Sequence, residues 1–414
     1  MTVGIVGMGY VGLPLAVAFA QAGHRVIAMD VDSRKVAALE RGESYIEDIP
    51  SEDVHEVRDL VEPTTRVGPL AHADAVLLCV PTPLTANREP DLGPLLDATR
   101  ALARVLRAGQ LVVLESTSYP GTTRERLLPM LEESGLAAGS DFSLAHSPER
   151  VDPGRVDHTI RNTPKVVGGL TEVCTQRASD LYSAICDEVV PVATPEVAEM
   201  TKLLENIFRS VNIALVNELA ILADRMSIDI WEVVDAAATK PFGFMRFEPG
   251  PGMGGHCLPV DPFYLAWRAR EFDFPTEFIE LAGKVNMQMP YHCVVKIERA
   301  LNDAGKAVKG SRVAILGVSY KAGIGDLRES PALKILRLLA DRGADLAYHD
   351  PHVPELPQGM RSQPLEQALD GADLAVIVTA HPEIDLNTVI RDAPRVVDLR
   401  GVTRRMPAPS VERL

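Results

Sequence analysis

The sequence predicts an α/β protein made of two Rossmann-like doubly wound domains, joined by a helical central domain that contains one long helix. Two observations support this prediction: short apolar runs alternate with helical patterns at both ends of the chain, and a long helical pattern separates these two regions. We expect the first domain to span residues 1–194, the helical domain 195–305 and the second α/β domain 306–414. A chain of 414 residues is long enough for three domains of this size.

The first α/β unit opens with a dinucleotide-binding fingerprint. The apolar run 2–7 leads directly into GMGYVG at residues 7–12, and a helical pattern continues to Gly23. A second apolar run, 25–29, then stops at Asp30. This order of strand, G-x-G-x-x-G, helix, strand and acidic residue is the context that the motif requires. The first glycine permits the tight turn, the second lets a pyrophosphate approach the backbone, and the third allows close packing of helix and strand.

Asp30 indicates which cofactor to expect. It lies 23 residues after Gly7, where a carboxylate accepts hydrogen bonds from the hydroxyls of the adenine ribose. Because the same carboxylate repels a 2′-phosphate, the sequence predicts NAD rather than NADP. The residues expected to contact the cofactor in this domain are Gly7, Met8, Gly9, Tyr10, Val11, Gly12, Asp30, Lys35 and Thr82.

Polar residues follow three more apolar runs of the first domain. The runs 75–80, 111–115 and 142–146 are followed by PTP at 81–83, STSYPGT at 116–122 and SPER at 147–150, respectively. Since ligands bind at the carboxyl edge of an open α/β sheet, we expect part of the site there. Capping of the following helices explains Ser118, Thr122 and Thr123 equally well, but it explains Glu149 poorly.

A long helical pattern occupies the middle of the chain. Apolar residues recur at helical spacing from Pro195 to about Met226, which is long for a helix of a globular protein. Lys202 and Asn206 project from one face because they are four residues apart, although Lys202 taken alone is better explained as a solvated lysine whose stem covers the core. A helix of this length and apolarity often connects domains or forms a dimer interface, so we expect a homodimer.

The second α/β unit starts with the apolar run 312–316 and echoes the order of elements of the first. It has no clean G-x-G-x-x-G, so it is expected to bind a nucleotide differently or not at all. His349 and His352 suggest a metal site, but a strand-end turn at Asp350-Pro351 is the preferred explanation, and we predict no metal.

Residues 247–264, FEPGPGMGGHCLPVDPFY, place a single cysteine, Cys257, in a run of glycines and prolines. Such a stretch forms no regular element and suits a loop whose backbone approaches a ligand closely. A cysteine held there is a candidate nucleophile, whereas the commoner alternative is a small buried thiol beside a turn.

Composition limits the partners and the compartment. The net charge of −15 argues against a nucleic-acid partner, and five cysteines without paired spacing suit free thiols in a reducing compartment. The chain enters a strand at Thr2, which leaves no room for a signal peptide, and we find no apolar run long enough to span a membrane. These observations predict a soluble cytoplasmic protein that binds neither nucleic acid nor membranes.

The chain resembles the UDP-glucose/GDP-mannose dehydrogenase family over essentially its whole length. Six motifs carry the resemblance in the family's order: GMGYVGLP (7–14), STSYPGTT (116–123), SPERVDPG (147–154), KLLEN (202–206), GGHCLPVDP (254–262) and GVSYKAGIGDLRESPA (317–332). The forms of 147–154 and 249–270 look like the UDP-N-acetylhexosamine branch, whereas UDP-glucose enzymes typically carry SPEF at 147–150. Arg246 departs from the residue expected in that branch.

The resemblance implies that a C6 alcohol is oxidised to a carboxylate with two NAD. UDP-N-acetylglucosamine is the first expected substrate, and UDP-N-acetylgalactosamine, UDP-N-acetylmannosamine and UDP-glucose are alternatives. Cys257 would attack the intermediate aldehyde, while Lys202 and Asn206 would stabilise the alkoxide and oxyanion. Either Asp261 or Glu149 would activate water.

The implied site residues fall into three groups. The catalytic residues are Cys257, Lys202, Asn206, Asp261, Glu149 and Thr117, the last orienting the water. The substrate contacts are Glu149, Arg150, Lys202, Asn206, Arg246, Gly254 and Lys321 of a UDP-sugar site, and Arg328 joins the cofactor contacts at the phosphates.

Two other functions remain open from the sequence. A simple hydroxy-acid dehydrogenase would share the fingerprint and the lysine helix, but it would form one NADH per substrate and would not need Cys257. A nucleotide-sensing binding module would bind cofactor without turnover, and the intact catalytic set argues against it.

Overall fold

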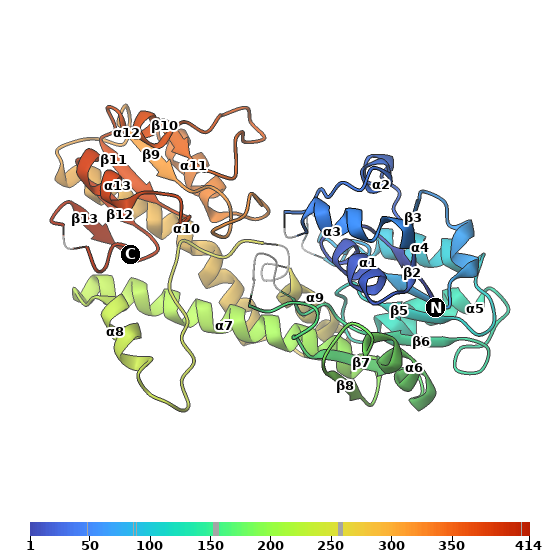
Figure 1. Ribbon diagram of the computed structural model, residues 1–414. Coiled ribbons are helices and arrows are strands. Elements are labelled where there is room, and N and C mark those ends of the chain that lie inside the picture. The colour runs from blue at the N-terminus through green and yellow to red at the C-terminus, as the bar shows by residue number, and fades with distance from the viewer. Residues whose placement is uncertain (48, 86, 88, 152–156, 256–259, 407) are drawn as a thin grey trace. The chain divides into compact units, whose positions relative to one another are not determined.

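The computed structural model of the protein describes all residues except 48, 86, 88, 152–156, 256–259 and 407 (Figure 1). The chain divides into two compact units, Met1–Glu205 with Phe263–Phe274, and Asn206–Pro262 with Pro275–Leu414. Each unit contains one sheet flanked by helices, and one long helix passes from the first unit into the second. The predicted fold class is therefore confirmed, while the division into 1–194, 195–305 and 306–414 stays a prediction.

The first unit is built on an eight-stranded sheet with the order β3-β2-β1-β4-β5-β6-β7-β8. Its strands are β1 (Thr2–Val6), β2 (Arg25–Met29), β3 (Val61–Thr64), β4 (Ala75–Leu78), β5 (Leu111–Leu114), β6 (Ser143–His146), β7 (Lys165–Gly169) and β8 (Val189–Val192). All neighbours in this described sheet are parallel except β6 and β7, which are antiparallel. The strand order reverses between β1 and β4, which is where ligands bind in doubly wound sheets.

Helices cover this sheet by burying one apolar face each. The helices of the first unit are α1 (Gly12–Gln21), α2 (Ser33–Glu40), α3 (Ser51–Glu56), α4 (Gly93–Ala103), α5 (Leu128–Glu132) and α6 (Glu172–Tyr182), with short turns η1 (Arg58–Leu60), η2 (Gly68–His72), η3 (Thr122–Leu127) and η4 (Arg270–Phe272). α9 (Asp261–Ala269) enters this unit at Phe263. Leu15 and Phe19 of α1 pack with Ile5 and Leu77 of the sheet in one continuous core.

α7 (Pro195–Met226) has the bounds that apolar periodicity predicts. Among the described residues, this helix is long and apolar enough to cross a membrane by length and composition, so the expectation of no such run is wrong. Four polar residues of this helix, Glu199, Asn206, Ser210 and Asn217, lie along one buried side of it. Glu199 and Asn217 are buried and hydrogen-bond to protein groups, and 44% of the most apolar window is buried.

The second unit contains a parallel sheet with the order β10-β9-β11-β12-β13. Its strands are β9 (Arg312–Leu316), β10 (Asp345–His349), β11 (Leu374–Ile377), β12 (Val396–Asp398) and β13 (Val411–Arg413), and its helices are α8 (Ile230–Ala237), α10 (Glu277–Asp303), α11 (Pro331–Asp341), α12 (Leu365–Leu369) and α13 (Leu386–Asp392). Three helices begin with a side-chain N-cap: Asp229 caps α8, Ser330 caps α11 and Asp385 caps α13. The indole N–H of Trp231 donates to the Leu414 carbonyl at 3.1 Å, which ties the last residue to α8.

Candidate active site

The fingerprint loop has the geometry that a pyrophosphate needs. Gly7 adopts a φ of 96°, and a Cβ there would lie 2.6 Å from the Cys79 carbonyl oxygen. A Cβ at Gly12 would lie 1.8 Å from the Gly7 oxygen, so both positions exclude side chains for packing reasons. A Cβ at Gly9 would meet no protein atom within 4 Å, which leaves the space in front of this residue open to a ligand. The loop therefore fits a bound dinucleotide.

Asp30 is buried just after β2, and its carboxylate hydrogen-bonds to the backbone of the fingerprint loop. Its Oδ2 accepts a hydrogen bond from the Met8 amide at 2.8 Å and lies 3.0 Å from Lys35 Nζ. Its Oδ1 accepts from the Asp32 amide at 2.8 Å. The carboxylate thus positions the backbone on which the phosphates would rest, in addition to its predicted contact with the ribose.

This geometry gives a prediction for Asp30→Ala. We expect a loss of NAD affinity of about 10–100-fold, the scale of one or two hydrogen bonds to a charged group. The preference for NAD should also relax, because the Lys35 ammonium would remain without its carboxylate partner and would attract a 2′-phosphate. Kd values for NAD and NADP measured by calorimetry test this, with Asp32→Ala on the same turn as control. Equal binding of both cofactors by the wild type would contradict it.

The loops after β4 and β5 are tied to each other and to α9. The Thr82 hydroxyl donates to the Thr117 carbonyl at 2.7 Å, and the Ser116 hydroxyl donates to the Val80 carbonyl at 2.6 Å. The Tyr264 hydroxyl donates to the Thr82 carbonyl at 2.8 Å. The hydroxyl proton of Thr82 is therefore already used in a hydrogen bond within the protein. In the predicted contact with the cofactor, the Thr82 oxygen would act as an acceptor.

The alternative explanation, that Ser118, Thr122 and Thr123 cap the following helix, is not borne out. Gly121, with a φ of 102°, occupies the cap position, and no side chain of the loop caps the turn. Instead the Glu199 carboxylate of α7 accepts hydrogen bonds from the amides of Gly121 and Thr123 at 2.6 and 2.8 Å. Burial raises the pKa of Glu199 to about 7, although these donors oppose the shift. A carboxylate 76 residues away does what a local hydroxyl was expected to do.

Glu149 lies just past β6 and is held as an ion. Its Oε1 accepts from the amides of Arg150 and Val151 at 2.8 and 2.6 Å, and Lys165 Nζ lies 3.3 Å from its Oε2. Burial alone would raise the pKa of Glu149, but Lys165, the Val151 amide and Lys202 outweigh it, and the pKa lies below its usual value. A mostly buried carboxylate that stays ionised at neutral pH suits a general base.

Arg150 reaches chain groups rather than open space. Its guanidinium lies 2.7 Å from the Glu205 carboxylate and donates to the Pro164 carbonyl at 2.6 Å. Its predicted contact with the substrate stays a prediction.

α7 and α9 bring two of the predicted catalytic residues together. Asn206 Nδ2 donates to Asp261 Oδ2 at 2.5 Å, and both side chains are buried. Lys202 is buried one turn before Asn206 on α7. Asp261 is the first residue of α9 and stands four residues after Cys257, which lies outside the described residues. The solvated-lysine explanation for Lys202 is thereby excluded.

The glycines before Cys257 lie close to other residues of the second unit. A Cβ at Gly254 would lie 2.5 Å from Tyr320 Cβ, and the Gly255 amide donates to the Arg328 carbonyl at 2.8 Å. A Cβ at Gly250 would lie 2.9 Å from a guanidinium nitrogen of Arg400. The expectation that glycine density here serves the approach of a ligand needs this correction, because residues 320–329 and Arg400 are the close neighbours.

Two predicted contact residues, Arg246 and Arg328, already form ion pairs with the protein. Arg246 lies 2.7 Å from Asp235 and 2.9 Å from Glu248, and Arg328 lies 2.5 Å from Asp326. Lys321 is half-buried in the loop after β9. Their roles toward sugar and cofactor, and that of Gly254, stay predictions.

Sequence reasoning missed Arg400, which follows β12. Its Nε donates to the Val378 carbonyl at 2.8 Å, and burial lowers the pKa of its guanidinium. No ion pair joins it to a carboxylate within the described part of the chain. A half-buried cation of this kind suits an anionic ligand group. The signal in the sequence is an arginine directly past an apolar strand of the second sheet.

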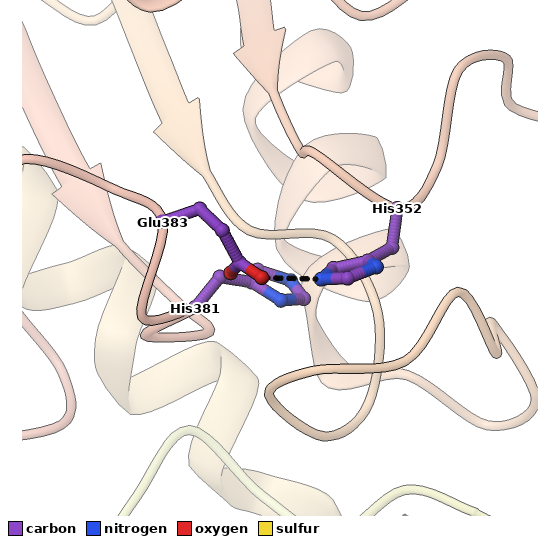
Figure 2. A group of neighbouring side chains, drawn as sticks. All are labelled: His352, His381 and Glu383. Carbon is purple, nitrogen blue, oxygen red and sulfur yellow. Dashed lines mark ion pairs between the residues drawn. The ribbon is translucent and has the colours of Figure 1, made fainter. Parts of the chain in front are cut away.

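The histidines after β10 and β11 form the cluster shown in Figure 2. His352 Nε2 lies 3.3 Å from Glu383 Oε1, and the rings of His352 and His381 are 4.9 Å apart. His381 Nδ1 accepts from the Gly323 amide, while its Nε2 lies 3.1 Å from Asp350, so neither nitrogen offers a lone pair to a metal. The Asp350 turn is confirmed, since Asp350 Oδ1 accepts from the amides of His352 and Val353.

Known proteins are similar to this chain over almost its whole length. Models of the UDP-glucose/GDP-mannose dehydrogenase family match in three consecutive parts: the NAD binding domain at 1–186, the central domain at 196–288 and the UDP binding domain at 314–405. The UDP-N-acetyl-D-mannosamine dehydrogenase of Pyrococcus horikoshii is 36% identical over 427 residues, which cover 98% of this chain and 99% of the relative.

One further relative and one solved structure are also similar to this chain. The UDP-N-acetyl-D-glucosamine 6-dehydrogenase of Pseudomonas aeruginosa is 36% identical over 355 residues, covering 85% of this chain and 83% of the relative. A solved structure of the Pyrococcus horikoshii UDP-D-ManNAc dehydrogenase superposes with a TM-score of 0.92 at 33% identity, covering 100% of this chain and 99% of that one.

Proposed function

Because this chain belongs to the UDP-glucose/GDP-mannose dehydrogenase family, we propose that it oxidises the C6 alcohol of a UDP-N-acetylhexosamine to the carboxylate while two NAD are reduced. Family membership makes it an NAD-dependent nucleotide-sugar dehydrogenase. The observation that carries the finer proposal is the Asn206–Asp261 pair, which joins the predicted oxyanion donor to the residue four positions after the predicted nucleophile. UDP-N-acetylglucosamine remains the first proposed sugar, and relatives named for N-acetylmannosamine make UDP-N-acetylmannosamine an equal candidate.

The proposed chemistry requires a thiol. Residues 7–12 would hold NAD, which would supply the hydride acceptor for each of the two oxidations. Cys257 adds to the aldehyde, so that a C–S bond forms and the carbonyl oxygen gains a proton, giving a thiohemiacetal. Loss of hydride and of the hydroxyl proton then gives a thioester. Water attacks the thioester carbon, the C–S bond breaks, and the carboxylic acid and the thiol are released.

Residues of α7 would carry the charge on oxygen. The buried Lys202 ammonium suits an alkoxide, because a cation kept out of water interacts strongly with developing negative charge. Asn206 has two amide N–H groups, and one of them donates to Asp261, which leaves the other for the oxyanion. We assign the activation of water to Glu149 rather than Asp261, because Glu149 stays ionised and Asp261 is already bound to Asn206.

The substrate assignment is tested by a panel of sugars. Catalytic efficiency and NADH yield are measured with UDP-N-acetylglucosamine, UDP-N-acetylmannosamine, UDP-N-acetylgalactosamine and UDP-glucose. We expect two NADH per sugar, one from each oxidation. We also expect an N-acetylhexosamine to be the best substrate, because a site built around the acetamide leaves polar groups unpaired when a hydroxyl replaces it. If UDP-glucose is the best substrate, the N-acetylhexosamine assignment fails. A yield of one NADH per sugar would instead favour the single-step dehydrogenase.

We also propose a homodimer through the central helices. Phe208, Leu215, Leu219, Leu222 and Met226 are exposed at helical spacing on one side of α7. Leu281, Tyr291 and Val295 of α10 in the same unit are exposed as well. Apolar side chains gathered on one exposed side of α7 support an interface there. The predicted cytoplasmic location stays a prediction, supported by the four described cysteines, which are all free.

The dimer predicts a clear result in solution. Light scattering after size exclusion should give about twice the 44.9 kDa chain mass, and the double variant Leu215→Asp with Leu222→Asp should give a monomer. The exposed Val173 of α6 supplies a matched control, because Val173→Asp places the same charge outside this surface. A monomeric wild type would rule the proposal out.

A further inference from the structure

A buried ionic cluster lies beside Glu149 and includes two residues that no motif singled out. Lys165 Nζ is 2.9 Å from Glu115 Oε2 and 3.3 Å from Glu149 Oε2. The exposed fraction of the Lys165 side chain is 5% and that of Glu115 is 0%. The Tyr182 hydroxyl donates to Glu115, and the Lys165 ammonium lies 5.1 Å from the centre of the Tyr182 ring. One ammonium therefore lies between two carboxylates, and both it and the Glu115 carboxylate are buried.

The topology explains why this lysine reaches this edge of the sheet. β6 and β7 are antiparallel, with Ala145 opposite Gly169 and His146 opposite Gly168. Continued past the end of β6, this register places Lys165 opposite residue 149. A parallel β7 would begin at the other edge, away from the carboxyl ends where Glu115 and Glu149 lie. The strand reversal thus delivers a cation to the edge that holds the candidate site.

The pKa values of the two carboxyl groups in this cluster are shifted in opposite directions. Burial raises the pKa of Glu115, whereas Lys165 helps to hold the pKa of Glu149 below its usual value. The other titratable groups facing the cluster are Tyr182, Cys79, His146, Cys186 and Lys202. Burial keeps the first four neutral: it raises the pKa of Tyr182 and Cys79, raises that of Cys186 to about 11 and lowers that of His146 to about 3.

Lys165 and Lys202 are therefore the two cations that act on Glu149 within the described residues, and they differ in what else they touch. Lys202 is itself assigned to the reacting oxygen, so its field on Glu149 changes with the substrate. Lys165 is locked between Glu115 and Glu149 by strand register and by burial. Two neighbouring carboxyl groups whose pKa values differ because their environments differ are typical of active sites in which one of them transfers a proton.

We propose that Lys165 is a positioning residue for Glu149: its ammonium holds the Glu149 carboxylate in place as the base that takes a proton from water, while Glu115 anchors the ammonium. In that step the water oxygen bonds to the thioester carbon, the C–S bond breaks, the sulfur leaves as thiolate, and one water proton passes to Glu149. The proposal rests on the proposed function. It assigns no contact between Lys165 and substrate.

The test compares three variants of the full chain. Lys165→Met removes the charge, Lys165→Arg keeps it, and Glu115→Gln removes the anchoring charge but leaves the ammonium. The titration of Glu149 is followed by carboxyl NMR of protein labelled with ¹³C-glutamate, with Glu149→Gln to assign the signal. We expect Lys165→Met to raise the pKa of Glu149 by at least about one unit, because the ammonium that forms an ion pair with Glu149 is lost. Lys165→Arg and Glu115→Gln should leave it at or below the wild-type value.

The same variants are measured with the UDP-N-acetylhexosamine that the panel identifies. In Lys165→Met the acid limb of kcat should move to higher pH by at least about one unit, with KM for NAD unchanged within about twofold. If Lys165→Met does not fold, the double variant Lys165→Met with Glu115→Gln, which removes both buried charges, serves instead. An unmoved titration of Glu149, or an equal rise in Glu115→Gln, would overturn the proposal. If no sugar is oxidised, the proposed function fails, and the NMR titration still decides what Lys165 does to Glu149.

Discussion

Replacing Cys257 with alanine is expected to abolish formation of the uronic acid, with a loss on the order of 10³-fold or more, the scale seen when a nucleophile is removed. The reason is chemical: the aldehyde must be converted into an adduct that can lose a second hydride, and a thiol adduct can be both oxidised and hydrolysed. The assay is acid formation and NADH yield with the best sugar of the panel. Cys174→Ser, on α6 of the first unit, is the matched control and should keep its activity.

Cys257→Ser sharpens the same prediction. A serine can form the analogous adduct, but an ester hydrolyses more slowly than a thioester, so the reaction should stall after the second oxidation. Intact-mass spectrometry of this variant after incubation with sugar and NAD should show the acyl adduct. Acid production near the wild-type rate by Cys257→Ala would exclude Cys257 as the nucleophile.

Lys202→Ala should lower kcat by roughly 10²–10³-fold, the scale for one donor to a developing oxyanion. The side chain is buried on α7, and its charge also helps to lower the pKa of Glu149, so both alkoxide stabilisation and water activation should suffer. NAD affinity should change little. Arg209→Ala, an exposed cation on the same helix, is the control for the loss of positive charge.

Steady-state kinetics separate this role from simple binding. If Lys202→Ala raises KM and leaves kcat unchanged, the lysine binds substrate and transition state equally and is not catalytic. A second variant, Lys202→Met, keeps the volume of the stem. It should lose as much kcat as the alanine variant if charge, rather than packing, is what the reaction uses.

Much of the fold could be predicted because its signals are local. The strands β2 and β9 and the helix α7 have the bounds that apolar periodicity predicts, and the fingerprint glycines have the tight turn and the close packing expected from their order. The capping explanation for Ser118, Thr122 and Thr123 failed because the group that accepts from this turn, Glu199, is on another element. Propensity identifies a residue able to cap, and it does not identify a better acceptor far along the chain.

The candidate site was predictable in its residue types and less so in its contacts. Lys202, Asn206, Glu149 and Asp261 were expected from motifs, and the structure pairs Asn206 with Asp261. Glu115, Lys165 and Arg400 were missed, since a charged residue at a strand end looks like a solvated one in sequence. Whether it is buried depends on the neighbouring strands, which lie far away in the chain.

The sequence by itself determined the doubly wound architecture, the nucleotide fingerprint with its acidic residue, and the long helix with its two polar residues one turn apart. These follow from spacing, because backbone geometry imposes periods and turns within a few residues. Only the tertiary structure decided that Lys165 is shared by Glu115 and Glu149, and that Gly254 and Gly255 pack on residues 320–329. Strand register and burial set those contacts, and burial gives a charge its strength by removing the water that would otherwise screen it.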